Sequence, residues 1–186
     1  PFLLHYLRAA GVPASHLVLS PTTSPALFRD GARWAANDPC FPAKLVPAHV
    51  DWLLTQRERP IEVLLLPTFT HAAIAVRGVA DTASCPIVAG SGQAALASMG
   101  RDGDRIAGRG VRTLTPSLTM TNRALLEAQL HDTFGELLDL DASANRDAVA
   151  HGLEAQATHG ARLRARGEWV LGRARGFAGP GAGRSL

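Results

Sequence analysis

The residues of this sequence best suited to chemistry are two cysteines, Cys40 and Cys85. Each is followed within two positions by a proline, and a stretch with helical periodicity begins directly after Cys40. The start of a helix presents unpaired N–H groups and the positive end of the helix dipole, which favour a thiolate over a thiol. Because iron–sulfur clusters, zinc and copper(I) prefer thiolate ligands, we expect both cysteines to bind one metal centre. Neither forms a CxxC pair, so spacing alone does not identify the metal.

A lysine near the first cysteine adds positive charge to this site. Lys44 is the only lysine among the 19 basic residues, and all the others are arginine. A positive charge near Cys40 would favour its thiolate form further. The alternative is a buried, unreactive Cys40 with Lys44 one turn away in solvent. The arginine bias is typical of a GC-rich genome, and we expect a bacterial protein.

Two histidines could complete a zinc site, which needs four ligands. His71 is expected in the loop that follows the strand Ile61–Leu66. His49 falls on the helix after Cys40, where a residue at the boundary of the core is the simpler expectation. The sequence therefore leaves open a structural zinc module that uses Cys40, Cys85 and one or both histidines.

Other kinds of site have weaker support. No Cys–His arrangement with a recognisable signature accompanies Cys40, so nucleophilic catalysis lacks a base. The turn Gly90–Gly92 precedes a helix and could hold a phosphate on free N–H groups. Asp51 lies on the polar face of its helix, where we expect it to be solvated, and no pair of carboxylates suited to acid–base catalysis is visible. Enzymatic activity of this chain alone is therefore the least expected outcome.

The elements that must position these residues alternate between strand and helix. Pro42 fits the first turn of the helix after Cys40, where its missing N–H would have no partner. The strongest strand is Ile61–Leu66, which is almost continuously apolar, as is typical of a parallel strand buried on both faces. Shorter strands are predicted at His16–Ser20, Ile87–Ala89 and Val111–Leu114.

This alternation predicts an α/β domain over residues 1–120, with a Rossmann-like, mostly parallel sheet and helices on both faces. In such sheets, ligands collect beyond the carboxyl ends of the strands. A C-terminal extension of two helices is predicted over residues 121–175, and Asp141 or Ser143 can cap the second helix. Residues 176–186 are rich in glycine and proline and are predicted to form a disordered tail.

Composition and charge restrict the class of protein. The chain has 186 residues, of which 46% are hydrophobic and 19% charged, as in an ordinary globular protein. It shows no apolar stretch of membrane-spanning length and no secretory signal, so we expect a cytoplasmic protein with reduced cysteines. The net charge of +3 is modest, and the arginines of the last helix are not interleaved with aromatic residues. We therefore expect neither nucleic acid nor a membrane as a partner.

Three motifs carry a resemblance to a known family. The most specific is Cys-Phe-Pro-Ala-Lys-Leu-Val-Pro-Ala-His-Val at Cys40–Val50. A strand that ends in Pro67 and the string Cys-Pro-Ile-Val at Cys85–Val88 follow in that order. In these motifs the sequence resembles the acyl-CoA dehydratase activase-related proteins, in particular their uncharacterised domain related to 2-hydroxyacyl-CoA dehydratase subunits. The resemblance covers residues 1–175.

The resemblance implies a domain in a system that transfers single electrons at low potential. In that system an ATP-dependent activator reduces a [4Fe–4S] dehydratase, which removes water from a 2-hydroxyacyl-CoA. Cys40 and Cys85 match two of the cysteines expected to face a cluster. The implied partners are therefore the activator, a dehydratase-type subunit and an acyl-CoA. No phosphate-binding signature of the activator type appears in this sequence, so the resemblance implies at most a component of a lyase system.

Two departures from the family pattern bear on the cluster. The family carries a third cysteine directly after the strand-ending proline, and Thr68 stands at that position here. A leading strand, expected before Pro1, is also missing from this sequence. Because a neutral threonine oxygen is a poor ligand for an iron–sulfur cluster, the cluster is held with another ligand, completed by another chain, or lost. Loss would leave a non-catalytic scaffold of the same fold.

Overall fold

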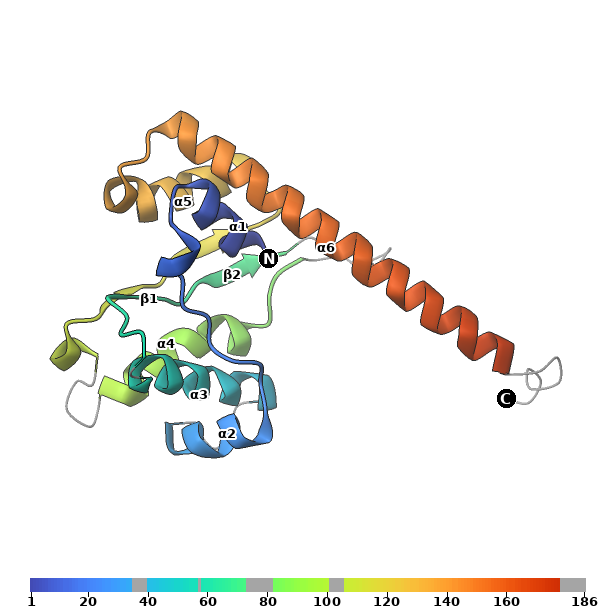
Figure 1. The fold of residues 1–186 in the computed structure, drawn as a ribbon, viewed down its shortest axis with the longest axis horizontal. Helices are drawn as coiled ribbons and strands as arrows, with labels where there is room; N and C mark the ends of the chain where they lie inside the picture. Colours follow the sequence, from blue (N-terminus) through green and yellow to red (C-terminus); the bar gives the residue numbers. More distant parts are fainter. Residues whose placement is uncertain (35–39, 57, 73–81, 101–105, 178–186) are drawn as a thin grey trace.

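The computed structural model describes residues 1–34, 40–56, 58–72, 82–100 and 106–177, and it confirms a mixed α/β fold (Figure 1). In chain order, the helices and strands are α1 (Phe2–Ala9), α2 (Pro25–Gly31), α3 (Phe41–Thr55), β1 (Val63–Leu65), β2 (Thr68–His71), α4 (Pro86–Gly100), β3 (Arg112–Leu114), β4 (Ser117–Thr119), α5 (Arg123–Leu138) and α6 (Ala142–Phe177). Short 3-10 helices occupy Ala14–His16, Ala32–Trp34 and Ala107–Arg109. Of the predicted tail, residues 178–186 lie outside the described part.

The strands form a narrow parallel ribbon. β1 pairs with β3 and β2 pairs with β4, in both cases in the predicted parallel sense. Pro67 and Pro116 separate the two pairs, because a proline has no N–H to give to a ladder. The N–H of Leu66 donates to the carbonyl of Leu114 (2.8 Å), and the N–H of Thr68 donates to that of Pro116 (2.8 Å). These two bonds continue the pairing past the prolines.

Helices cover both faces of the ribbon, with α3 and α4 on one side and α1, α5 and α6 on the other (Figure 1). Alternate residues of a strand point to opposite faces. Leu64 and Leu66 accordingly belong to the core shared with α3 and α4. Leu65 packs against the core formed by α1, α5 and α6. This explains why the strand needed an almost continuous apolar sequence.

A buried polar contact joins α1 to α5 and to the start of α6. The Tyr6 hydroxyl of α1 donates to Asn145 Oδ1 of α6 (2.9 Å), and Asn145 Nδ2 donates to the Glu127 carbonyl of α5 (2.9 Å). Tyr6 and Asn145 are 0% and 2% exposed. The three helices are therefore connected by hydrogen bonds inside their shared hydrophobic core.

Short polar side chains cap the starts of two helices, α2 and α6. Ser24 Oγ accepts the Leu27 N–H (3.1 Å) at the start of α2. Asp141 Oδ1 accepts the N–H groups of Ser143 (2.7 Å) and Ala144 (2.8 Å) at the start of α6. The bond from the Ala144 N–H, with that from Ser143, lowers the pKa of the Asp141 carboxyl. Asp141 rather than Ser143 is thus the cap.

Four local predictions are wrong. Ile87–Ala89 is not a strand and Gly90–Gly92 is not a turn, because both lie inside α4, which begins at Pro86. A short apolar run does not separate a strand from a buried helix. Thr68–His71 forms β2 instead of the start of a loop. At His16–Ser20 the chain leaves a 3-10 helix and runs on extended, and no described strand pairs with it.

Helix α6 has 36 residues, which corresponds to a length of about 54 Å. Its first part packs against the body through Ala148 and Val149, which are buried. From Gln156 to Ala174 the side chains are exposed, except at the half-buried Gly160, and this part extends beyond the rest of the molecule (Figure 1). Despite its length, neither α6 nor any other described helix is apolar enough to cross a membrane.

Candidate functional site

Both cysteines lie directly before a helix. Cys40 is the N-cap residue of α3, and its carbonyl accepts the N–H groups of Ala43 (3.0 Å) and Lys44 (3.3 Å). Cys85 precedes α4 in the same way, and its carbonyl accepts the Ala89 N–H (2.9 Å). Both thiols are free and exposed, so the alternative of a buried, unreactive Cys40 is wrong. The sequence predicted a helix after Cys40 but a strand after Cys85.

The two helix starts lie on the same side of the molecule. Val50 and Leu54 of α3 share a hydrophobic core with Ala95 and Met99 of α4. In Figure 1 both helices run in the same direction, and each begins on the side toward which β2 points. The packing of α3 on α4 therefore places the starts of both helices, each preceded by an exposed cysteine, on one side of the fold.

Thr68 lies beside the second of these helix starts. It opens β2, and its Oγ1 donates to the Ala89 carbonyl in the first turn of α4 (3.1 Å). The side chain at the position where the resemblance implies a third cysteine therefore contacts the helix that follows Cys85. In the sequence, only the resemblance drew attention to Thr68. Its contact with Ala89 could not be predicted, because the two residues are 21 positions apart.

His71 ends β2 and lies next to the segment that leads into Cys85. It forms an isolated antiparallel bridge with Ala83, and the Ser84 N–H donates to the Thr70 carbonyl (2.8 Å). His71 Nδ1 is buried, and it has no hydrogen-bond partner in the described part of the chain. An unpaired buried ring nitrogen can accept a proton donor or bind a metal. The imidazole of His71 therefore belongs to a strand that pairs with the segment leading into Cys85.

His49 is engaged on both ring nitrogens. Its Nδ1 lies 2.9 Å from Ser20 Oγ, and its Nε2 lies 3.0 Å from Thr23 Oγ1. These bonds attach the segment before α2 to α3. The prediction of a boundary residue is therefore confirmed, and the alternative role as a zinc ligand has no free nitrogen to support it.

This environment makes a prediction about pH. Burial lowers the pKa of His49 below its ordinary value, so the unfolded chain takes up the proton more readily than the folded one. The stabilisation is present above the unfolded pKa, near about 6.5, and is lost as the pH falls through the folded value. We expect urea unfolding to show lower stability at pH 5 than at pH 7.5, with a smaller difference in His49→Gln. The exposed His16→Gln serves as the control, and an unchanged pH dependence in His49→Gln would contradict the assignment.

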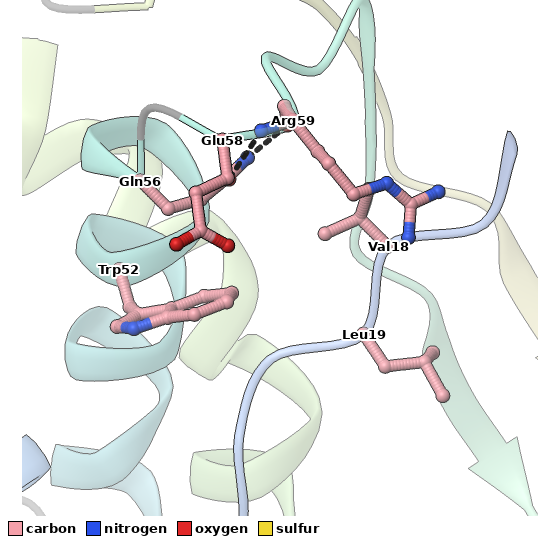
Figure 2. Close-up of a pocket in the computed structure, with 6 residues that line it drawn as sticks. All are labelled: Val18, Leu19, Trp52, Gln56, Glu58 and Arg59. Atoms are coloured by element: carbon pink, nitrogen blue, oxygen red, sulfur yellow. Dashed lines mark hydrogen bonds between the residues drawn. The ribbon is translucent and has the colours of Figure 1, made fainter. Parts of the chain in front are cut away.

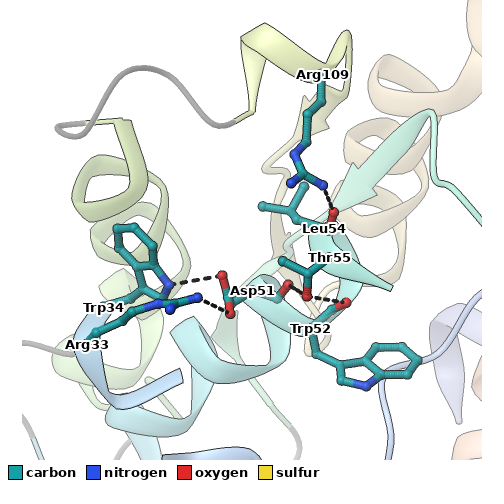
Figure 3. Close-up of polar contacts among 7 residues, drawn as sticks. All are labelled: Arg33, Trp34, Asp51, Trp52, Leu54, Thr55 and Arg109. Carbon is teal, nitrogen blue, oxygen red and sulfur yellow. Dashed lines mark hydrogen bonds and ion pairs between the residues drawn. The ribbon is translucent and has the colours of Figure 1, made fainter. Parts of the chain in front are cut away.

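Asp51 is buried and structural, so its prediction as a solvated residue is wrong. It is 7% exposed and accepts hydrogen bonds from Trp34 Nε1 (2.9 Å) and Arg33 (3.3 Å), as Figure 3 shows. The carboxylate joins the 3-10 helix after α2 to the middle of α3. A partner 17 residues away leaves no local signal in the sequence.

The structure gives no support to a phosphate site at Gly90–Gly92. These residues lie in the second turn of α4 and not at its start. Ser91 is mostly buried, and its hydroxyl donates to the Val88 carbonyl (2.6 Å). The N–H groups of this segment therefore belong to the helix ladder.

A surface groove lies at the other end of α3, near its last residues (Figure 2). Its volume is about 480 Å³. On one side of the groove, Gln56 Oε1 accepts the Arg59 N–H (2.9 Å). The groove is lined by Val18, Leu19, Trp52, Gln56, Glu58 and Arg59. Because Cys40 and Gln56 cap opposite ends of this 15-residue helix, the groove is separate from the helix start at Cys40.

The described residues do not form a closed metal site by themselves. Within them, no group of three or more His, Cys, Asp or Glu side chains is placed to hold one ion. The starts of α3 and α4 offer the thiols of Cys40 and Cys85. Strand β2 contributes the hydroxyl of Thr68 and the imidazole of His71. Lys44, half-buried, lies at the end of the first turn of α3.

One comparison with known proteins gives a match. A family model described as the CoA enzyme activase uncharacterised domain matches residues 1–180. No curated protein and no solved structure matches the chain significantly.

Proposed function

The chain belongs to the family of CoA enzyme activase uncharacterised domains, and from that premise we propose that Cys40 and Cys85 are two ligands of an iron–sulfur cluster. The cluster would serve low-potential electron transfer in a 2-hydroxyacyl-CoA dehydratase system. In this proposal the chain is a component of that system and not an enzyme on its own. Its partners are an ATP-dependent activator and a dehydratase-type subunit.

The observation that carries the proposal is the placement of the two thiols. Each cysteine precedes a helix, and the two helices pack together and begin on the same side of the ribbon (Figure 1). Two helix N-termini on the same side of the fold favour negative charge there. A thiolate-bound cluster is anionic, so this arrangement suits it better than it suits two neutral thiols. Both sulfur atoms are also accessible to a cluster.

The donor set fits a cluster in part. A [4Fe–4S] cluster is usually held by four cysteines, and this chain supplies two. Thr68 contacts the helix start that follows Cys85, but its hydroxyl is a weak ligand for iron. We therefore propose that a second chain, or a small-molecule thiol in its absence, supplies the remaining ligands. When bound, the cluster would accept and release single electrons.

A second candidate function is a scaffold of the same fold that has lost its cluster. The contact of Thr68 favours it, because the hydroxyl at the family's cysteine position is used in a hydrogen bond to Ala89. The zinc module has less support. His49 has no free ring nitrogen, and the described part of the chain contains no cluster of three potential ligands.

The test is the iron and acid-labile sulfide content of protein reconstituted without oxygen. We expect iron and a brown colour in the parent, and loss of most of the iron in Cys40→Ser and in Cys85→Ser. Because both thiols are exposed, the serine variants should keep the far-UV circular dichroism and urea midpoint of the parent. Loss of iron without loss of fold is therefore a site effect.

Thr68→Cys separates the two candidate functions. If the parent binds no iron and Thr68→Cys gains it, the scaffold account is correct. If iron binds equally to the parent and both serine variants, the proposed ligands are wrong. Stoichiometric zinc that resists dialysis, and that both serine variants lose, would instead support the zinc module.

A further inference from the structure

The projecting part of α6 carries apolar side chains that nothing in the described molecule covers. Leu163 is 58% exposed and Val170 is 50% exposed, and both lie in the part that extends beyond the body (Figure 1). This surface has a regular pattern. Gly160, Leu163, Gly167, Val170 and Ala174 follow one another at alternating steps of three and four residues. We refer to these five residues as the seam.

The seam continues a stripe that is already used for packing. Extended toward the helix start by the same steps, it passes through the exposed Gln156 and then through Leu153 and Val149. Val149 is fully buried against α1 and α5, and Leu153 packs against the same core. Alternating steps of three and four residues form a heptad repeat, which is typical of a helix that packs along its length against another helix. The seam therefore has the form of a helix-packing face without its second helix.

The length and glycine content of the projecting part of α6 indicate that the seam packs against another protein segment in the functional state. Isolated helices shorter than about 12–15 residues are marginal in water, and most helix stability in proteins comes from packing. Each glycine in a helix interior costs about 1 kcal/mol relative to alanine. Gly160, Gly167 and Gly172 lie within the projecting part. At Gly167 an added Cβ would meet nothing within 4 Å, so this chain does not use the space that the glycine leaves.

The charge beside the seam indicates the kind of partner. Arg164 and Arg166 occupy positions next to the seam, where facing helices exchange charged contacts. Glu168 lies one residue further from the seam, so no acidic residue of the projecting part adjoins the seam. A second copy of this helix packed antiparallel would place arginine opposite arginine. A helix with acidic residues at the corresponding positions would be complementary.

We propose that the seam of α6 docks an amphipathic helix of a partner protein whose positions beside the contact are acidic. A large apolar side chain of that helix fills the space over Gly167, and its carboxylates face Arg164 and Arg166. The proposal concerns α6 alone and holds whether or not the cysteines bind a cluster.

The probe is a synthetic peptide of three heptads with leucine at the contact positions and glutamate beside them. The same peptide with lysine in place of glutamate is the reference. Binding is followed by fluorescence anisotropy of labelled peptide against the full 186-residue chain. We expect the glutamate peptide to bind at least about tenfold more tightly than the lysine peptide, with a preference that weakens as salt is added.

Variants of the chain locate the contact. Leu163→Glu and Val170→Glu should each remove binding of the glutamate peptide. Trp169→Glu is the matched control, because Trp169 is 60% exposed but lies on the other side of α6, over which Arg173 folds back (4.9 Å). Arg166→Glu should weaken binding more than Arg162→Glu, since Arg162 is not beside the seam.

Three outcomes would overturn the proposal. One is equal binding of the two peptides, and another is a loss in Trp169→Glu as large as that in Val170→Glu. The third is dimerisation of the parent chain, measured by sedimentation, that Val170→Glu abolishes. That result would assign the seam to a second copy.

Discussion

Gly31→Ala is expected to lower the free energy of unfolding by about 3 kcal/mol, although it adds a single methyl group. Gly31 ends α2 where this helix meets α3. A Cβ atom there would lie 2.3 Å from Ala48 Cα and 2.4 Å from Ala48 Cβ. Ala48 is buried, and its backbone cannot rotate away as a long side chain would. Helix α2 must therefore move off α3, and urea unfolding should show the loss as a lower midpoint.

The matched control is Gly90→Ala in α4. A Cβ at Gly90 would meet nothing within 4 Å, so the substitution should raise stability by about 0.5–1 kcal/mol through helix propensity alone. Opposite signs for the two variants would establish that the close approach of α2 and α3 sets the requirement for glycine. A similar small effect of both would show that α2 moves aside without cost.

Asn145→Leu is expected to destabilise the fold by about 3 kcal/mol. Leucine has the branching of asparagine but larger end groups and no polar atoms, so it leaves the buried Tyr6 hydroxyl without its acceptor and removes the donor to the Glu127 carbonyl. Tyr6→Phe removes one bond only and should cost less. Because removing both polar groups avoids an unpaired hydroxyl, Tyr6→Phe/Asn145→Leu should be more stable than the sum of the single changes predicts. Additive effects would show that the two side chains are not coupled.

Alkaline unfolding gives an independent check on the same contact. Burial raises the pKa of Tyr6 to about 12. The folded chain thus keeps the proton that the unfolded chain loses near pH 10, so this stabilisation is complete below about pH 10 and disappears as the pH rises through about 12. Stability should therefore fall over this range in the parent and fall less in Tyr6→Phe.

The sequence predicted the features that depend on neighbouring residues. The predicted cap Asp141 starts α6 because a short polar side chain can accept the N–H groups two or three positions ahead. Ser24 and Asn122 start α2 and α5 in the same way. The Val111–Leu114 strand and its parallel pairing follow from strand–helix alternation. The helix start at Cys40 was predicted for the same local reason.

Features that depend on distant contacts were not predictable in this way. Asp51 was assigned to solvent because its own helix shows a polar face, while its partners come from the 3-10 helix before it. The helix after Cys85 was taken for a strand, because Ile87–Ala89 is short and apolar in either structure. The contact of Thr68 with the start of α4 required the register of β2, which the sequence does not give.

The hydrogen bond between Tyr6 and Asn145 also determines the order in which the domain can form during synthesis. These residues are 139 positions apart, so α1 leaves the ribosome long before the start of α6 exists. At synthesis rates of about 5–20 residues per second, the apolar face of α1 stays without its partner for about 7–28 s. The body on the other side of the ribbon has its helices, α3 and α4, within the preceding segment of chain. The nascent domain therefore completes that half first, and α1 remains a target for chaperones until translation reaches α6.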